Sequence, residues 1–283
     1  MNESNALITH WKNATQAFQK NILAVERRVD HEAIHDARVA MKKLRSYALL
    51  YDEAAGTALY KQIKKFSMLY RTAGACRDTY NSLQLVKKFS KKLNCEFQLF
   101  CAYLQFTLQA NLRYLRYVLK VRPVLVQEWQ ELENAITSSE LHSAHIIKSM
   151  QGVIVGLWEN IRVPKSMDDA EWLHNLRKEL KRIFYSLQAV PMPERFSTHQ
   201  IKEIRELNTL FGKWQDLHQL EVRTKDFKEN LLCKGTSEYA HIKQLLKAIE
   251  KEKESEYSAL RQKLSLLLKA DWAMAVKSLA VAW

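Results

Sequence analysis

Glycine and proline are scarce in this chain of 283 residues, which contains 6 glycines and 4 prolines. All-β folds and the glycine-rich loops that cradle nucleotides need more turn residues than this. Hydrophobic residues still make up 47% of the sequence, which is enough to bury a substantial core. Leu, Ala, Lys, Gln and Glu are abundant, and all of them favour helix. The composition therefore predicts an all-α protein.

The sequence also lacks a long uninterrupted hydrophobic run. Residues 1–20 contain no apolar core of a secretory signal, and the apolar stretch 264–283 is broken by Lys269, Asp271 and Lys277. The 4 cysteines form no CxxC pair and show no disulfide framework, which favours reduced thiols. We therefore expect a cytoplasmic protein without a membrane partner.

Signatures of catalysis are missing as well. The sequence contains no Walker loop, no HExxH and no GxSxG motif. No cluster of carboxylates that would hold Mg²⁺ for phosphoryl transfer is evident. These absences favour a binding protein over an enzyme, and we expect neither a cofactor nor a metal site.

What the chain does contain is an internal repeat. The stretch IHDARVAMKKLRSYALL (34–50) resembles LHNLRKELKRIFYSLQA (173–189), and His174 follows His35 by 139 residues. Arginine and lysine recur in register behind each histidine. The match suggests that one basic helix occurs twice.

A second pair of stretches repeats at almost the same distance. KQIKKFSMLYRTAGACRD (61–78) matches HQIKEIRELNTLFGKWQD (199–216) at an offset of 138 residues. Two matches at nearly one offset indicate a tandem duplication, with a first half at 1–138 and a second at 139–283.

Each half contains the same series of helices with short connections. Short connections favour antiparallel neighbours, so we expect two helical bundles of the four-helix type related by a pseudo-twofold axis. The predicted helices lie at 5–29, 32–54, 57–75, 77–93 and 96–121, then at 143–162, 169–189, 197–211, 213–231 and 237–269. The predicted breaks lie at Asp30, Gly56, Gly74, Pro123, Pro164, Pro191 to Pro193 and Gly235.

The stretch 35–45 contains a single acidic residue, Asp36, and the whole chain carries a net charge of +13. At 100° per residue, the cations and the histidine of this stretch fall on one face, opposite an apolar face. A solvated helix face is the ordinary explanation of such a row, but it usually includes acidic partners three or four positions away. The first basic row is His35, Arg38, Lys42 and Arg45, flanked by Lys43, and the second is His174, Arg177, Lys181 and Arg182.

A pseudo-twofold axis would bring these two basic rows into one groove or pore. Cations that face each other need an anion between them, and cations on successive turns lie roughly 5 Å apart along a helix. That spacing suits a polymer with regularly placed phosphates, for which Arg offers forked hydrogen bonds and Lys a point charge. The histidines would add ring N–H donors and would bind phosphate more tightly as the pH falls from about 8 to about 6.

The repeated pattern H-x-x-R-x-x-x-K-K/R, followed each time by a Gly…Asp segment (GACRD and GKWQD), resembles the CHAD domain family over nearly the whole chain. The resemblance implies that 1–283 is a single CHAD-like domain made of two repeats. It also implies a basic central pore that binds inorganic polyphosphate, and an association with polyphosphate granules. The implied polyphosphate-binding residues are His35, Arg38, Lys42, Lys43, Arg45, His174, Arg177, Lys181 and Arg182.

The second copy departs from the first at two positions. Phe184 stands where the first half has Arg45, so we expect the second half to bind more weakly. Gln215 replaces Arg77. Further basic residues are weaker candidates for the same polyanion: Lys64, Lys65, Arg71, Arg113, Arg116, Lys120 and Lys202.

Two other functions remain open at this stage. The same charge would suit the phosphate backbone of RNA or DNA, which we otherwise expect only as a nonspecific competitor. Tyr114 and Tyr117 beside Arg113 and Arg116 are the one sign of base contacts, and core packing explains them equally well. A polyphosphate-acting enzyme, or its regulatory subunit, would require a carboxylate pair or a metal in the pore.

Overall fold

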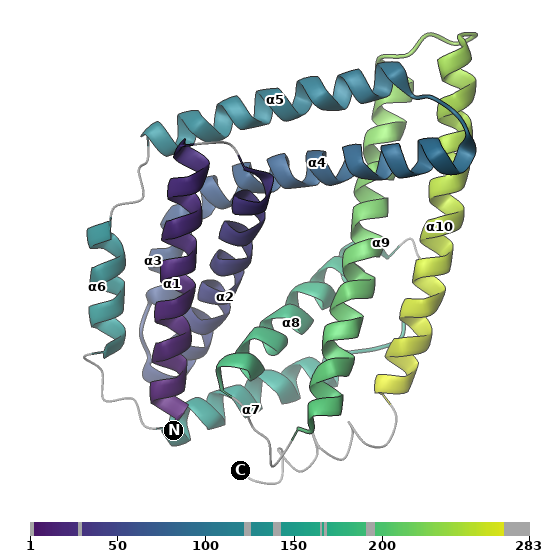
Figure 1. The fold of residues 1–283 in the computed structure, drawn as a ribbon. Coiled ribbons are helices and arrows are strands. Elements are labelled where there is room, and N and C mark those ends of the chain that lie inside the picture. The colour runs from purple at the N-terminus through teal and green to yellow at the C-terminus, as the bar shows by residue number, and fades with distance from the viewer. Residues whose placement is uncertain are drawn as a thin grey trace.

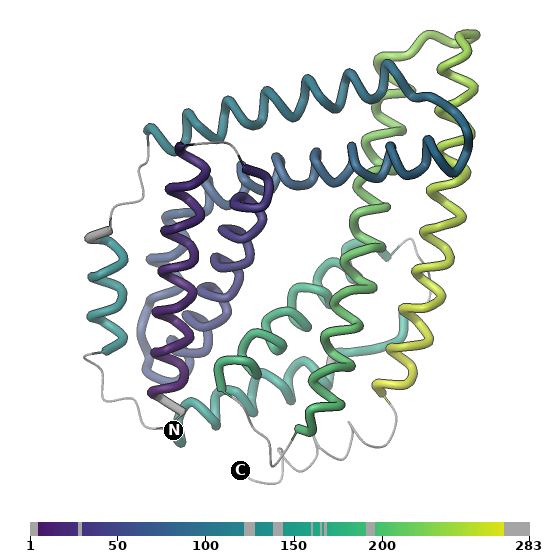
Figure 2. Tube along the Cα trace, viewed as in Figure 1, coloured from purple at the N-terminus to yellow at the C-terminus, as the bar shows by residue number. Residues whose placement is uncertain are grey.

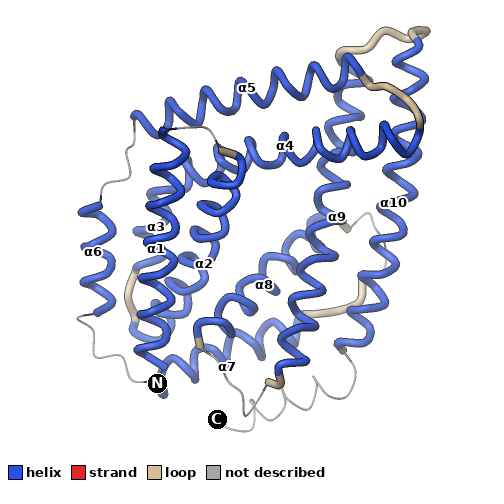
Figure 3. The backbone as a smooth tube through the Cα atoms, in the orientation of Figure 1, coloured by secondary structure: helices blue, strands red, loops and turns tan. Residues whose placement is uncertain are grey.

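The computed structural model describes residues 3–27, 30–121, 126–137, 143–164, 166, 169–190 and 196–268. Helices account for every regular element in these ranges, and none of them contains a strand (Figure 3). The predicted all-α fold is confirmed. The elements are α1 Glu3–Arg27, α2 His31–Ala55, α3 Leu59–Ile63, η1 Lys64–Phe66, α4 Ser67–Leu93, α5 Gln98–Val121, α6 Val126–Thr137, α7 Ser143–Asn160, α8 Ala170–Ala189, α9 Thr198–Asn230 and α10 Ser237–Leu267.

Local capping defines the ends of the helix that carries the first basic row. The Asp30 carboxylate accepts a hydrogen bond from the backbone N–H of Glu32 at 2.9 Å, which satisfies a free donor at the start of α2. Gly56 ends α2 in the left-handed conformation, with φ of 66°, and donates its N–H to the Asp52 carbonyl. Both predicted breaks, Asp30 and Gly56, are therefore confirmed.

Two other predicted breaks are wrong. Helix α4 runs through Gly74, and α9 runs without interruption from Thr198 to Asn230, through Gly212. A glycine inside a helix weakens it by only about 1 kcal/mol, which packing on both sides easily offsets. The turn in the first half instead falls at η1, and α6 was not predicted at all. The breaks predicted at Pro123 and at Pro191 to Pro193 lie outside the described residues.

Long antiparallel helix pairs dominate the architecture. Helix α1 packs along α2, α4 along α5, and α9 along α10. Figure 1 shows the α4–α5 pair reaching across the molecule to the α9–α10 pair, and Figure 2 shows the same crossing along the Cα trace. Helix α2 also contacts α8. The two predicted halves thus meet in two regions: α1 and α2 contact α7 and α8, and α4 contacts α9 and α10.

The hydrophobic core follows these contacts instead of the boundary between the halves. One cluster joins α1 and α2 to α7, α8 and the start of α9, and includes Trp11, Leu44 and Leu180. A second cluster joins the far ends of α4 and α5 to α9 and α10, with Phe100 against Phe227 at a centroid distance of 4.9 Å. Neither cluster belongs to one half, so the halves fold on each other. The pseudo-twofold relation remains a prediction.

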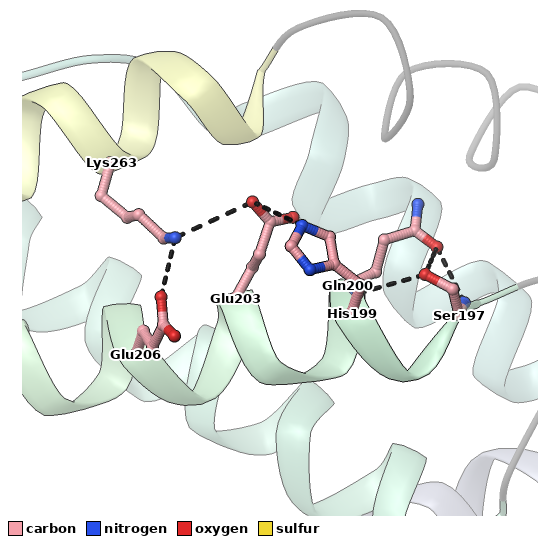
Figure 4. A network of polar contacts seen from close by, with 6 residues as sticks. All are labelled: Ser197, His199, Gln200, Glu203, Glu206 and Lys263. Carbon is pink, nitrogen blue, oxygen red and sulfur yellow. Dashed lines mark hydrogen bonds and ion pairs between the residues drawn. The ribbon is translucent and has the colours of Figure 1, made fainter.

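Polar contacts fix α9 against α10 near the start of α9 (Figure 4). Ser197 and Gln200 form a capping box, in which the Ser197 hydroxyl accepts from the Gln200 N–H at 3.2 Å and the Gln200 amide oxygen accepts from the Ser197 N–H at 2.9 Å. One turn further on, Lys263 of α10 lies 2.8 Å from Glu206 and 3.8 Å from Glu203. These contacts hold the second half of the chain in register.

Within the described ranges, no helix is both long and apolar enough to cross a membrane. The stretch 264–283, which was judged too charged to do so, lies mostly outside the described residues.

Candidate functional site

The two basic rows meet where α2 contacts α8. Lys42 of α2 and Lys181 of α8 lie within hydrogen-bonding reach of each other, and Arg38 and Arg177 act electrostatically on both lysines. We call these four residues, Arg38, Lys42, Arg177 and Lys181, the cationic cluster. Two of them come from each half of the chain.

Lys42 is the most perturbed member of the cationic cluster. Burial, and then the charges of Lys181, Arg38 and Arg177, lower its pKa to about 6, although Asp78 opposes the shift. Burial, and then the charge of Arg177, lower the pKa of Lys181 to about 8. An ammonium group that is both desolvated and surrounded by cations loses its proton more easily. The positive charge of the cationic cluster is therefore poorly compensated by the protein at neutral pH.

Arg38 is held in place by two residues of α4. Its Nη1 donates to the Tyr70 carbonyl at 2.8 Å, and its guanidinium carbon lies 4.7 Å from the centroid of the Tyr70 ring. Arg45 lies over the same ring at 4.1 Å, an arrangement typical of a cation–π contact. A Cβ atom at Gly74 would be 2.5 Å from Arg38 Nη1. Gly74 thus provides the space that Arg38 occupies.

Aspartates of α4 and α9 support the other side of the cluster. Burial lowers the pKa of Arg177, and Asp216, followed by Asp78, opposes the change. Burial raises the pKa of Asp216 although Arg177 and the Asn81 amide, 3.5 Å from Asp216 Oδ2, favour its charged form. Asp78 and Asp216 are fewer than the four members of the cationic cluster, so an excess of positive charge remains.

Several guanidinium nitrogens at the site are buried and have no hydrogen-bond partner among the described residues. They are Nε of Arg45, Nε of Arg177 and Nη1 of Arg77. Buried donors are nearly always paired in folded proteins, so each unpaired one requires an explanation. The oxygens of an anion are acceptors of the kind that such donors require.

The two histidines differ in their surroundings. Burial, and then the charges of Arg77 and Lys42, lower the pKa of His35, which places it beside the cationic cluster. His174 is exposed, with its Nδ1 3.3 Å from the Gln215 amide oxygen. Since Gln215 replaces Arg77, the departure seen in the sequence changes the environment of the second histidine.

Comparison with known proteins places these features in a family. The sequence profile described as "CHAD domain" matches residues 9–224. That range covers more than half of the chain and contains both basic rows. The chain belongs to the CHAD domain family.

Solved structures agree with the fold of a CHAD domain. The crystal structure of the CHAD domain from the plant Ricinus communis superposes with a TM-score of 0.70 at 20% identity, covering 93% of this chain and 91% of that one. PptA from Streptomyces chartreusis superposes with a TM-score of 0.61 at 11% identity, covering 93% and 98%. At these identities the likeness shows the fold alone. Comparison with curated protein sequences gives no match.

Besides Arg45 and the two histidines, two residues predicted for the binding site of this CHAD domain lie outside the cationic cluster. Lys43 lines a pocket between α1 and α2, where burial, and then the charge of Lys43, lower the pKa of His10. Arg182 is 3.3 Å from Glu53 and 3.8 Å from Glu179. Lys43 directly follows Lys42, and Arg182 directly follows Lys181. Because successive residues of a helix are rotated by 100°, both side chains lie on another face of their helix than the lysine before them.

The weaker candidates are all exposed and appear in none of the interactions of the cationic cluster: Lys64, Lys65, Arg71, Arg113, Arg116, Lys120 and Lys202. Lys64 instead lies over the Tyr60 ring, 5.1 Å from its centroid. These side chains therefore contribute at most long-range charge to the site.

Sequence reasoning missed three residues that shape the site. Tyr70 holds two arginines, yet Asn208 stands at the matching position of the second half, so the repeat gave no signal. Arg77 and Asn81 are likewise not repeated. The recurrence of Asp78 at Asp216, in the Gly…Asp segments of the two halves, was a usable signal. Among the described residues, no group of three His, Cys, Asp or Glu side chains is placed to hold a metal ion.

Proposed function

We propose that this chain binds inorganic polyphosphate in a basic groove between α2 and α8, through Arg38, Lys42, Arg177 and Lys181, with His35, Arg45 and Arg77 beside them. The observation that carries the proposal is the depressed pKa of Lys42, about 6, caused by burial and then by cations of both halves. A chain of phosphates between the two rows would restore full charge to both lysines. It would also accept hydrogen bonds from the unpaired guanidinium nitrogens.

Partial burial favours polyphosphate over nucleic acid at this site. Lys42, Arg177 and Lys181 are partly buried, whereas phosphate-contacting side chains on a duplex-binding surface are exposed. An inorganic phosphate chain is thin and carries no sugars or bases, so it needs less room beside these side chains than a duplex does. Nucleic acid remains the second candidate because it offers the same phosphate charge.

The remaining parts of the proposal concern the role of the protein. The described site contains a cationic cluster with two supporting aspartates, and we propose binding without catalysis. Localisation to the cytoplasm, and association with polyphosphate granules, would follow from such binding. His174 would contact the polymer only at the solvent side of the groove, since it is exposed.

The test is a competition experiment. Labelled long-chain polyphosphate is titrated with the protein at physiological salt and challenged with tRNA and with duplex DNA. Arg38→Glu and Arg177→Glu are expected to lose binding, whereas Arg205→Glu, an exposed change of equal charge on α9, is expected to retain it. Affinity should fall as salt rises, because binding releases counterions. Ready displacement by tRNA, or full binding by both cluster variants, would reject the proposal.

A further inference from the structure

The outer face of α5 carries an unusual concentration of exposed hydrophobic side chains. The inner face of the helix is buried, with residues such as Leu104, Leu108 and Leu112. Of the 10 large hydrophobic side chains that are exposed in the described part of the chain, half lie on this one helix. They are Leu99 at 55%, Phe106 at 75%, Tyr114 at 51%, Tyr117 at 59% and Val121 at 57% exposed. Such a concentration marks an interaction surface.

The charge on this face has a single sign. No Asp or Glu occurs between Glu96 and Glu128. Arg113, Arg116 and Lys120 are exposed, and no carboxylate of the described residues pairs with any of them. Figure 1 shows α5 at the outer edge of the α4–α5 pair, with α4 between it and α8. The face is therefore separate from the cationic cluster.

The two tyrosines form a stacked pair within this basic stretch. The ring centroids of Tyr114 and Tyr117 are 6.3 Å apart, and their planes differ by 19°. Each tyrosine directly follows an arginine, Arg113 or Arg116. Their exposure rules out core packing, which the sequence had left open. Exposed aromatic rings interleaved with cations form the usual platform for unpaired bases.

We propose that the C-terminal half of α5 binds single-stranded nucleic acid, at a site distinct from the cationic cluster. Bases stack on Tyr114 and Tyr117, and the backbone phosphates contact Arg113, Arg116 and Lys120. Phe106 lies on the same face and extends the row of rings.

The polar residues of the same face favour nucleic acid over a lipid surface. Gln105, directly before Phe106, and Gln109, between Phe106 and Arg113, are both exposed. Their amides offer donors and acceptors to base edges. Burying these amides among acyl chains, without hydrogen-bond partners, is unfavourable. The binding platform thus has the chemistry of an unpaired strand: rings for bases, cations for phosphates and amides for base edges.

The experiment uses the full chain and a fluorescent oligouridylate of about 15 nucleotides, a length within the usual range for single-strand sites. Anisotropy titrations compare the wild type with the double variants Tyr114→Ala/Tyr117→Ala and Tyr114→Phe/Tyr117→Phe. The alanine variant should lose about 10- to 100-fold in affinity, while the phenylalanine variant retains binding because the rings remain. Leu99→Ser, at the other end of the same face, is the matched control and should bind as the wild type does.

Two further readouts separate this site from the cationic cluster. Polyphosphate binding should survive in the alanine double variant, and oligouridylate binding should survive in Arg177→Glu. Equal oligouridylate affinity of the wild type and the alanine variant would overturn the proposal, as would loss of that affinity in Arg177→Glu. Binding of the wild type to anionic vesicles but not to the oligonucleotide, with loss in the alanine variant, would overturn it in favour of a lipid surface.

Discussion

At the scale of single residues, the site contains positively charged groups that the nearby carboxylates do not fully neutralise. Lys42 is desolvated and surrounded by three other cations, so its folded-state pKa of about 6 lies well below the 10.5 of a free lysine. Between these two pH values the unfolded chain binds more protons than the folded one. The free energy of unfolding therefore rises with pH across this window, and below about pH 6 the full destabilising effect of Lys42 is present.

Replacing Lys42 with methionine should make the unliganded protein more stable and the binding weaker. Methionine keeps the packing of the side chain and removes an amine whose protonation is opposed by burial and by neighbouring cations, so we expect a gain of about 1–3 kcal/mol in the free energy of unfolding at pH 7. Urea denaturation measures this gain. Lys251→Met, an exposed change on α10, is the control and should leave stability nearly unchanged. A destabilised Lys42→Met variant would contradict the account of an uncompensated charge.

At the scale of helices, the two halves build their sites differently. In the first half, Gly74 allows α4 to approach Arg38 closely, and Tyr70 fixes both Arg38 and Arg45. In the second half the space beside Gly212 is open, and Phe184 replaces the second arginine. The first half thus holds two arginines against the Tyr70 ring, whereas the second half has Asn208 at the position of that tyrosine.

The glycine pair provides a matched test of this difference. In Gly74→Ala the new methyl group displaces the Arg38 guanidinium, so polyphosphate affinity should fall about tenfold, as expected for losing a hydrogen bond to a charged group. The fold should survive, because the clashing atom is the end of a flexible side chain. Gly212→Ala meets open space, so affinity should be unchanged and stability should rise by about 0.5–1 kcal/mol. Equal affinity of the two variants, measured by titration with polyphosphate, would show that Gly74 does not position Arg38.

At the scale of the whole molecule, the halves are joined at the site and in the core. Helix α2 meets α8 at the cationic cluster, and the second hydrophobic cluster combines α4 and α5 with α9 and α10. A lysine of one half therefore changes the chemistry of a lysine in the other. This coupling distinguishes one shared site from two independent ones.

Removal of one lysine should change the titration of the other. The charge of Lys181 is, after burial, the largest cause of the depressed pKa of Lys42. Because Lys181→Met removes this charge, the pKa of Lys42 should rise. Side-chain NMR of isotope-labelled lysine follows this titration directly. Lys251→Met should leave it unchanged, and an unchanged Lys42 pKa in Lys181→Met would mean that the two rows do not share a site.

The sequence was sufficient for the helical class, for most helix positions and for the residues of the cationic cluster, because composition, periodicity and the repeat all act locally. It failed at Gly74 and Gly212, where packing from both sides keeps a helix intact across a weak residue. It also failed for Tyr70 and Arg77, which have no counterpart in the second half. The repeated motif also wrongly grouped Lys43 and Arg182 with the cationic cluster, since adjacent positions on a helix contact different neighbours.

The central claim is that a phosphate polymer binds where Lys42 and Lys181 meet, and proton uptake tests it most directly. At pH 8 the free Lys42 is largely neutral and Lys181 partly so, while a bound polyanion raises the pKa of both. Calorimetric titration with long-chain polyphosphate, in two buffers of different ionisation enthalpy, should report an uptake of about one to two protons per protein molecule that binds. The affinity should correspondingly increase as the pH falls from about 9 to about 6, and Lys42→Met should reduce the uptake. Tight binding without proton uptake would contradict the account, because the polymer would then lie elsewhere on the protein.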